Sequence, residues 1–188
     1  MADALIVVDM QMAFVHGPNA VPGGAELAER IEHLLGRARA AGVLVIHLQN
    51  DGPEGAADEP GTPGWDLALP LHLGEHELVL RKTMDDGFDG TELGELLRLS
   101  GVNRLVICGV QSEMCVGATA RTALARRLRV VLPHDAHGTY DIPAVPGLAE
   151  RVPARHVSRV AEWALGDEVE IIAHAADVEF IEAARPKA

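Results

Sequence analysis

The chain has few cysteines, few aromatic residues and a shortage of positive charge, and these shortages exclude several classes of protein. Cys108 and Cys115 fit neither a disulfide framework, nor a zinc knuckle, nor the redox Cys-x-x-Cys spacing. The formal net charge of −12, from 28 acidic and 16 basic residues, would repel nucleic-acid phosphates and anionic membranes. No apolar run has the length of a membrane span or the flanks of a signal peptide. We therefore expect a protein of the reducing cytoplasm that binds neither nucleic acid nor membrane.

Short, β-branched apolar runs alternate with segments of helical spacing, which predicts an α/β fold with a mostly parallel sheet and helices on both faces. The length and the lack of a linker predict one domain over residues 1–181, with a frayed tail at 182–188. The predicted strands are residues 5–8, 43–48, 77–81, 104–110, 129–132 and 169–172. The predicted helices are residues 27–38, a segment between Thr91 and Gly101, 115–127 and 153–165.

Three of these predicted strands lead to a reactive side chain. The first leads to Asp9, the third leads to Lys82, and the fourth leads through a turn to Cys115. The carboxyl ends of parallel strands lie at one edge of the sheet, where open α/β folds bind their ligands. A carboxylate, an ammonium and a thiol gathered at that edge are typical of an activated nucleophile.

Cys115 opens a predicted helix, where unpaired backbone amides and the helix dipole would stabilise a thiolate. The same amides would also donate hydrogen bonds to an oxyanion. The alternative is that Cys115 is a small, buried apolar residue. Cys108 lies inside an apolar run, so we expect it in the core.

Asp9 and Lys82 each have a simpler explanation when taken alone. Asp9 follows four apolar residues, where an acid is costly without a partner, but a cap or turn role would also explain it. Lys82 alone would be a surface charge. Their convergence with Cys115 favours catalysis, because the ammonium would favour the thiolate and the carboxylate would carry a proton to a leaving amine.

Residues 50–64 form a predicted loop, because seven glycines and prolines exclude regular structure there. Loops of this length in a compact domain often act as lids. Trp65 follows the loop and either lines a pocket or packs the loop onto the core. Burial preferences favour the packing role.

Three separated motifs surround the reactive side chains. They are Asp9-Met10-Gln11 followed by Phe14; Lys82 followed by Phe88 and Thr91; and the run from Gly109 to Val116 followed by Thr119 and Ala123. Together, over about residues 4–141, they resemble the isochorismatase-like cysteine hydrolases of the isochorismatase/nicotinamidase superfamily. Residues 63–65 and 135–141 more loosely resemble its streptothricin-hydrolase-like subgroup.

The resemblance implies a three-layer αβα sandwich around a six-stranded parallel sheet, with Asp9, Lys82 and Cys115 as a catalytic triad. It implies hydrolysis of an amide-type C–N bond through a thioester on Cys115. Members that cleave isochorismate usually lack this cysteine, so vinyl ether hydrolysis is the less favoured alternative. The residues that it assigns to a cis peptide and an oxyanion hole are Val110, Gln111, Met114 and Cys115.

Two possible metal sites are incomplete in the sequence. Nicotinamidases of the superfamily have Asp-x-His and a later His after the second strand, whereas residues 49–52 here read Gln-Asn-Asp-Gly. His134 and His137 follow another predicted strand, but they lack a third and a fourth ligand. His47 lies within a strand and is expected to pack there. We therefore expect an enzyme without a metal or other cofactor.

The substrate is expected to be a small molecule, and relatives of this kind commonly form homo-oligomers. Asp85 and Asp86 would form an acidic rim that favours a neutral or cationic substrate, unless they are solvated turn residues. The residues expected to line or position the substrate are Gln11, Phe14, Trp65, Phe88 and Gln111.

Two other functions remain open on the same fold. A catalytically silent binding protein would show slow alkylation of Cys115, whereas an activated thiol would react fast at about pH 6 to 7. A redox sensor would form a sulfenic acid on Cys115, with no resolving cysteine expected nearby.

Overall fold

A computed structural model describes residues 2–74 and 76–181; the predicted tail at 182–188 lies outside the described residues. All strand pairs in the described sheet are parallel. The strands are β1 (Ala2–Val8), β2 (Leu44–Asn50), β3 (Glu77–Lys82), β4 (Val102–Val110), β5 (Arg129–Pro133), β6 (His137–Gly138) and β7 (Val169–Ile172).

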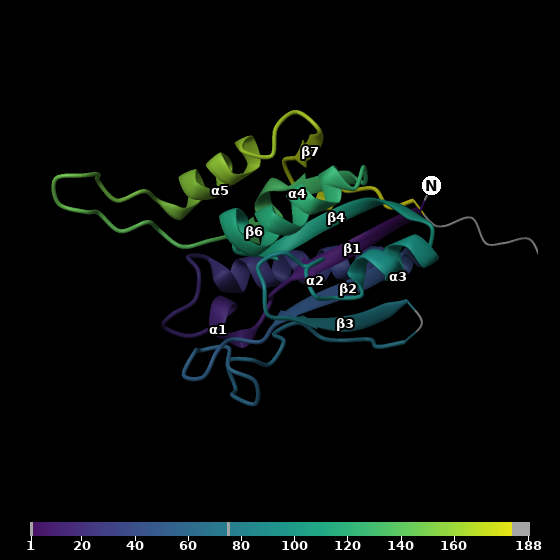
Figure 1. The fold of residues 1–188 in the computed structure, drawn as a ribbon, viewed down its shortest axis with the longest axis horizontal. Coiled ribbons are helices and arrows are strands. Elements are labelled where there is room, and N and C mark those ends of the chain that lie inside the picture. The colour runs from purple at the N-terminus through teal and green to yellow at the C-terminus, as the bar shows by residue number, and fades with distance from the viewer. Residues whose placement is uncertain (1, 75, 182–188) are drawn as a thin grey trace, which may run out of the picture.

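Helices cover both faces of the sheet (Figure 1). They are α1 (Met12–Val15), α2 (Gly24–Ala40), α3 (Leu93–Leu99), α4 (Gly117–Ala125) and α5 (Ala154–Trp163), with short helical turns η1 (Ser112–Val116), η2 (His134–Ala136) and η3 (Ala175–Asp177). In the described part of the chain, none of these helices combines the length and apolar character that a membrane crossing requires.

The strand order reverses between β1 and β4. The strands follow the order β3-β2-β1-β4-β5-β7, and the short β6 pairs with β4. The chain builds outward from β1 in one direction through β2 and β3, and in the other through β4 and β5. In open parallel sheets, ligands bind at the carboxyl edge where the order reverses in this way. The reversal here lies between the ends of β1 and β4.

The core has two halves because successive residues of a strand point to opposite faces. On one face, Leu5 packs with Ile31 of α2. On the other, Ile6 packs with Leu93 of α3 and Ala120 of α4. All five side chains are at most 1% exposed, and burying each large aliphatic one stabilises the fold by about 2 kcal/mol. Burial on both faces explains why the strands are continuous apolar runs.

The predicted α/β sandwich is confirmed, and all six predicted strands are present within three residues of their expected ends. The two-residue strand β6 was not predicted, because two residues carry no periodic pattern. The helix expected at 115–127 is instead the π-helical turn η1 followed by α4. Cys115 therefore lies inside a turn that precedes the helix.

Candidate active site

Asp9 is placed by a sharp turn at the end of β1. Its backbone amide donates to the carbonyl of Leu48 at 3.0 Å, which continues the pairing of β1 with β2. Asp9 then adopts a left-handed backbone with φ of 49°, a conformation that aspartate tolerates better than most residues. The carbonyl of Asp9 accepts from the Gln11 amide at 2.7 Å. The chain thus leaves the sheet and the Asp9 side chain stays at its edge, 2% exposed.

Lys82 is the last residue of β3 and lies in register with Asn50, the last residue of β2. Its side chain is fully buried, which is costly for an ammonium unless charged or polar partners surround it. The register brings the end of β3 level with the end of β2. From there the long side chain of Lys82 reaches over β2 towards β1.

Cys115 is brought to the same edge by β4 and η1. Gly109 of β4 has φ of 120°, and a Cβ atom there would lie 2.0 Å from the carbonyl oxygen of Val8, so only glycine allows this approach of β4 to β1. The peptide between Val110 and Gln111 is cis, as the family resemblance implies. The turn η1 then presents Cys115, which is partly buried.

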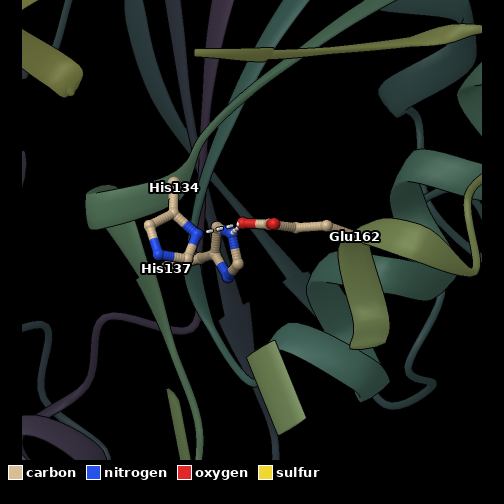
Figure 2. Close-up of side chains that lie close together, drawn as sticks. All are labelled: His134, His137 and Glu162. Atoms are coloured by element: carbon tan, nitrogen blue, oxygen red, sulfur yellow. Dashed lines mark hydrogen bonds and ion pairs between the residues drawn. The ribbon is translucent and has the colours of Figure 1, made fainter. Parts of the chain in front are cut away.

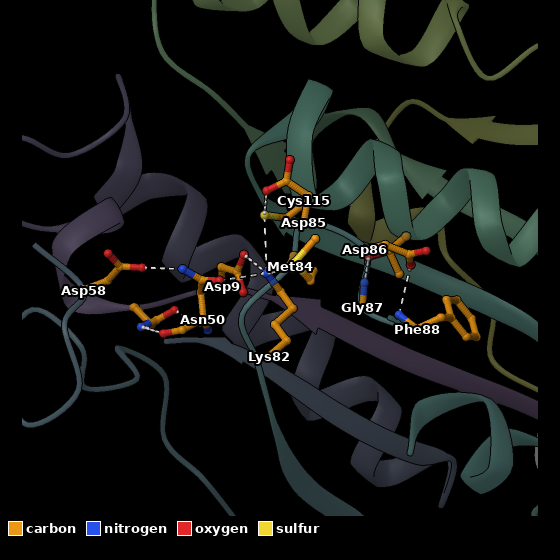
Figure 3. A network of polar contacts seen from close by, with 12 residues as sticks. Asp9, Asn50, Asp58, Lys82, Met84, Asp85, Asp86, Gly87, Phe88 and Cys115 are labelled. Carbon is orange, nitrogen blue, oxygen red and sulfur yellow. Dashed lines mark hydrogen bonds and ion pairs between the residues drawn. The ribbon is translucent and has the colours of Figure 1, made fainter. Parts of the chain in front are cut away.

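The three side chains meet at the β1–β4 reversal (Figure 3). The ammonium nitrogen of Lys82 lies 2.9 Å from Asp9 Oδ2 and 3.4 Å from Cys115 Sγ. It also donates to the Met84 carbonyl at 3.1 Å and to Asn50 Oδ1 at 3.4 Å. The sequence predicted that an acid, an amine and a thiol would gather here, and the structure brings these three together. Lys82 is the centre of the group.

The protonation pattern differs from the expected thiolate. Burial raises the pKa of the Cys115 thiol, and the Asp9 carboxylate raises this pKa further against the opposing effect of Lys82. Burial also raises the pKa of Asp9, although Lys82 opposes it. Burial by itself would lower the pKa of Lys82, but Asp9 and Cys115 more than offset this, so the pKa is raised. The raised pKa leaves Cys115 a neutral thiol, and the 2.9 Å contact pairs Lys82 with Asp9 beside it.

Asp9 has one oxygen without a partner. Its Oδ1 atom is buried and receives no hydrogen bond from any described residue, whereas Oδ2 pairs with Lys82. A buried carboxylate oxygen without a donor is rare, because the desolvation of that oxygen costs about 1 to 3 kcal/mol. With no donor of its own, this oxygen is available to accept a proton.

Asp85 contacts the Cys115 thiol, whereas the sequence predicted only that it lies in an acidic rim. The Cys115 thiol lies 3.6 Å from Asp85 Oδ1, and Asp85 is exposed. Asp86 instead accepts from the Phe88 amide at 2.9 Å and from the Thr122 hydroxyl at 2.6 Å. The predicted acidic rim is therefore reduced to one carboxylate at the nucleophile, and Asp86 is a turn residue.

Asn50 and Asp58 were missed by the sequence analysis. Asn50 Nδ2 donates to Asp58 Oδ2 at 2.6 Å, while its Oδ1 faces Lys82. Asp58 comes from the loop after β2 and is 6% exposed. The sequence did offer a signal for Asn50: it is a polar residue that follows a predicted strand, and that strand neighbours the strand that leads to Lys82. Asp58 gave none, because its burial depends on how the loop folds.

Gln11 and Trp65 both hold the loop, and Gln11 has no exposed surface to offer a substrate. Gln11 is fully buried; its Nε2 donates to the carbonyls of Asn50 at 3.0 Å and Trp65 at 3.1 Å, and its Oε1 accepts from the Asn50 amide. The Trp65 indole donates to Asp51 at 2.9 Å, and the Arg81 guanidinium lies 5.1 Å from its ring centre. The structure contains the loop-packing contacts of Trp65, and its role as a pocket wall stays a prediction.

Phe88 is also a packing residue. It is 6% exposed in the core beside α3, and the Arg126 guanidinium lies 4.7 Å from its ring centre. Figure 3 shows the ring directed away from Cys115. Phe14 and Gln111 are partly buried, Phe14 against the core on the α2 face and Gln111 directly after the cis peptide. Their roles as substrate contacts stay predictions.

The backbone amides expected for an oxyanion hole are only partly available. The Met114 amide already donates to the Gln111 carbonyl at 3.2 Å within η1, and the Val110 side chain is buried in the core. Met114 has φ of −99° and ψ of −105°, outside the helical region, which turns the following Cys115 amide away from the helical direction. The Cys115 amide is therefore better suited to an oxyanion than that of Met114.

The end of β2 does not fit a nicotinamidase-type metal site. Asn50 is engaged by Lys82 and Asp58, and both Asp51 carboxylate oxygens accept from Arg81 at 3.0 Å. His47 lies within β2, fully buried, and its Nε2 faces Glu77 at 3.1 Å. The residues here offer neither a free oxygen pair nor an imidazole to a metal ion.

Comparisons with known proteins agree with this geometry. The family model for the isochorismatase domain matches residues 3–152. A streptothricin hydrolase from Streptomyces noursei is 63% identical over 97% of this chain and 73% of its own length. The crystal structure of an isochorismatase from Pseudomonas putida KT2440 has a TM-score of 0.84 at 29% identity, covering 94% of this chain and 90% of that one.

A pyrazinamidase from Pyrococcus horikoshii, solved in complex with zinc, is also similar, with a TM-score of 0.75 at 28% identity over 92% of this chain and 99% of that one. The family model covers most of the described chain, and the two solved structures share its fold over more than nine-tenths of its length. The chain therefore belongs to the isochorismatase family of hydrolases.

Proposed function

We propose that this hydrolase cleaves an amide-type C–N bond of a small molecule through a thioester on Cys115. The observation that carries the proposal is the position of Lys82, whose ammonium contacts both Asp9 at 2.9 Å and the Cys115 sulfur at 3.4 Å. This contact lies at the sheet edge where ligands bind in such folds. A nucleophile beside a base that is itself held by a third group is the arrangement that covalent catalysis requires.

The reaction begins with a proton transfer. The free oxygen of Asp9 takes the thiol proton as the sulfur attacks the substrate carbonyl, so no resting thiolate is needed. Lys82 stabilises the negative charge, first on Asp9 and then on the sulfur, because it contacts both. The oxyanion of the tetrahedral intermediate accepts from backbone amides at η1, that of Cys115 foremost.

The C–N bond then breaks and a thioester remains. Protonated Asp9 gives its proton to the leaving amine, so the carboxylate is restored at the same moment. A water molecule next gives a proton to Asp9 and attacks the thioester carbonyl. The C–S bond breaks, the acid product leaves, and Asp9 returns the proton to the sulfur. The sum is one amide and one water converted to one acid and one amine.

The substrate we propose first is a streptothricin, because the streptothricin hydrolase relative shares 63% of the residues across 97% of this chain. Asp85 beside the nucleophile favours a neutral or cationic molecule over an anionic one. The similarity to a pyrazinamidase makes a small aromatic amide the second class to test. We propose further that the protein is cytoplasmic, that it forms a homo-oligomer, and that it binds neither nucleic acid nor membrane.

An acid-quench experiment tests this proposal. The enzyme is mixed with streptothricin or pyrazinamide, quenched in acid within the first turnover, and its intact mass is measured. We expect a mass increase equal to the acyl part of the substrate, mapped by peptide digestion to Cys115, and one ¹⁸O atom in the acid product formed in H₂¹⁸O.

Cys115→Ala is the matched variant, because it removes only the sulfur from a partly buried position. Turnover by this variant at the wild-type rate would overturn the proposal. A mass increase of one oxygen after peroxide, with no acyl adduct from any amide, would favour the redox alternative. That alternative has little support, since Cys108 is fully buried in β4 and cannot serve as a resolving thiol.

A further inference from the structure

Figure 2 shows two histidines and a glutamate that converge, and two of the elements that carry them, β6 and α5, contact η1. His134 comes from η2, His137 from β6 and Glu162 from α5. Glu162 Oε1 lies 2.5 Å from His134 Nδ1 and 3.0 Å from His137 Nε2. His137 and Glu162 have almost no exposed side-chain surface, whereas the His134 side chain is 46% exposed.

Glu162 supplies the third ligand that the sequence lacked. The three donor atoms lie within 4.8 Å of one another. Tetrahedral zinc with ligands at about 2.1 Å holds its donor atoms about 3.4 Å apart, so shifts of under about 1 Å would close the site. Two imidazoles and one carboxylate are a zinc ligand set that leaves the fourth position open to water.

The surroundings of His137 match those of a metal ligand. Its second ring nitrogen, Nδ1, lies 2.8 Å from the Ser112 hydroxyl, which in turn lies 2.9 Å from the hydroxyl of Ser158. Metal-bound histidines almost always use the second nitrogen in such a hydrogen bond, which fixes the ring and its tautomer. With zinc bound, a proton on Nδ1 donated to Ser112 would leave the Nε2 lone pair of His137 for the ion, in place of the hydrogen bond that Nε2 now makes to Glu162.

The cluster also has access to solvent. A cavity of about 450 Å³ is lined by both histidines and by Ser158, together with Asp135, Asp141 and Arg155. A metal ion can therefore enter, and its open coordination position would face this cavity. Glu162 keeps a second oxygen, which accepts from Arg159 at 3.2 Å and steadies the carboxylate.

We propose that His134, His137 and Glu162 form a zinc site that is separate from the Asp9–Lys82–Cys115 group. The ion would join α5 to the segment after β5, and through Ser112 it would hold the first residue of η1, the turn that carries Cys115. The ion would supply no step of the hydrolysis at Cys115. The site lies after β5, whereas a nicotinamidase-type site would lie after β2.

Zinc binding by the full chain tests the proposal. The protein, without a histidine tag, is stripped with a chelator and titrated with Zn²⁺ by calorimetry, with bound metal counted by mass spectrometry. We expect one ion per chain and a higher melting temperature with zinc. His134→Gln should weaken binding by more than about 10-fold, the loss that even an outer partner of a ligand causes. Its exposed position makes this variant safe for folding.

Two control variants separate this site from others. His156→Gln removes an exposed histidine of the same helix, α5, and should bind zinc as the wild type does. Cys115→Ser should also keep the zinc. When Co²⁺ replaces zinc in the protein, its absorption spectrum should show no thiolate charge-transfer band. The proposal fails if the wild type binds no zinc, or if His134→Gln and Glu162→Gln both bind it with wild-type affinity.

Discussion

Strand β3 has a buried charge at each end, and the two charges have different surroundings. At the first residue, Glu77 accepts through Oε1 from Arg39 at 2.7 Å, His47 at 3.1 Å and the His72 amide at 3.0 Å, and through Oε2 from Arg39 at 2.8 Å. The hydrogen bonds from Arg39 are the largest of the effects that lower the pKa of Glu77 to about 2. At the last residue, Lys82 pairs with Asp9, whose second oxygen has no partner.

The difference separates a structural ion pair from a reactive one. Both oxygens of Glu77 are occupied, so this carboxylate can take up no proton without losing a hydrogen bond. Asp9 pairs with Lys82 through Oδ2 and keeps Oδ1 without a partner, and burial raises its pKa. The residue at the amino end of β3 thus stabilises the fold, and the residue at its carboxyl end belongs to the reactive group. The carboxyl end is the edge where ligands bind in these sheets.

Asp9→Asn is the change that should separate the two ends most. An amide has nearly the same shape as the carboxylate but cannot accept the thiol proton, so we expect kcat to fall by about 10²- to 10⁴-fold. Steady-state kinetics on the substrate found by acid quench measures this. Circular dichroism and thermal melting should show a folded protein. A fall in kcat of less than threefold would show that the free oxygen of Asp9 is not the base.

Glu77→Gln should have the opposite effect. Loss of the carboxylate leaves Arg39 and the buried His47 without their shared partner, so the free energy of unfolding should fall by about 3 kcal/mol. The kcat of the folded fraction should change by less than about twofold, because Glu77 stands at the far end of β3 from Lys82. Urea unfolding followed by fluorescence measures the stability.

Glu95→Gln is the control for Glu77→Gln. It breaks an exposed ion pair with Arg98 on α3, and such pairs contribute little. Its unfolding curve should overlay that of the wild type. Equal losses of stability in both variants would mean that burial of the Glu77 pair contributes nothing.

The pH dependence of stability sharpens the same contrast. The pKa of Glu77 is lowered from 4.5 to about 2, so its contribution is complete above pH 4.5 and is lost as the pH falls towards 2. This difference in pKa corresponds to about 3 kcal/mol. The gap in unfolding free energy between wild type and Glu77→Gln should therefore narrow over that range. A gap that stays constant down to pH 2 would contradict the assignment.

The sequence predicted the sheet and three site residues for one physical reason. A parallel strand buried on both faces is a continuous apolar run, and a charged residue that ends such a run has to lie at an edge. Asp9 and Lys82 were found in this way, and Cys115 through the turn after β4. The family resemblance then connected them.

The other site residues could not be predicted because their burial depends on tertiary packing. Glu162 is an ordinary charge on α5 until that helix packs beside His137, and Asp58 becomes buried only when its loop folds back to Asn50. Gln11 follows Asp9 closely, yet its side chain turns to the loop. Spacing along the chain does not reveal these directions.

Asp85→Asn should have the smallest effect of these changes. The Asp85 carboxylate is one of the groups that raise the pKa of the Cys115 thiol, after burial, and it lies 3.6 Å from the sulfur. Its removal should lower this pKa, so alkylation of Cys115 by iodoacetamide near neutral pH should become a few-fold faster, about threefold. Asp86→Asn is the matched control. The Asp86 carboxylate binds Thr122 and the Phe88 amide, so this variant should leave the alkylation rate unchanged.

If both variants react at the wild-type rate, Asp85 does not act on the thiol. If Asp85→Asn instead raises KM for a cationic substrate with kcat unchanged, this carboxylate also contributes to substrate binding, a role that no residue around Glu77 has.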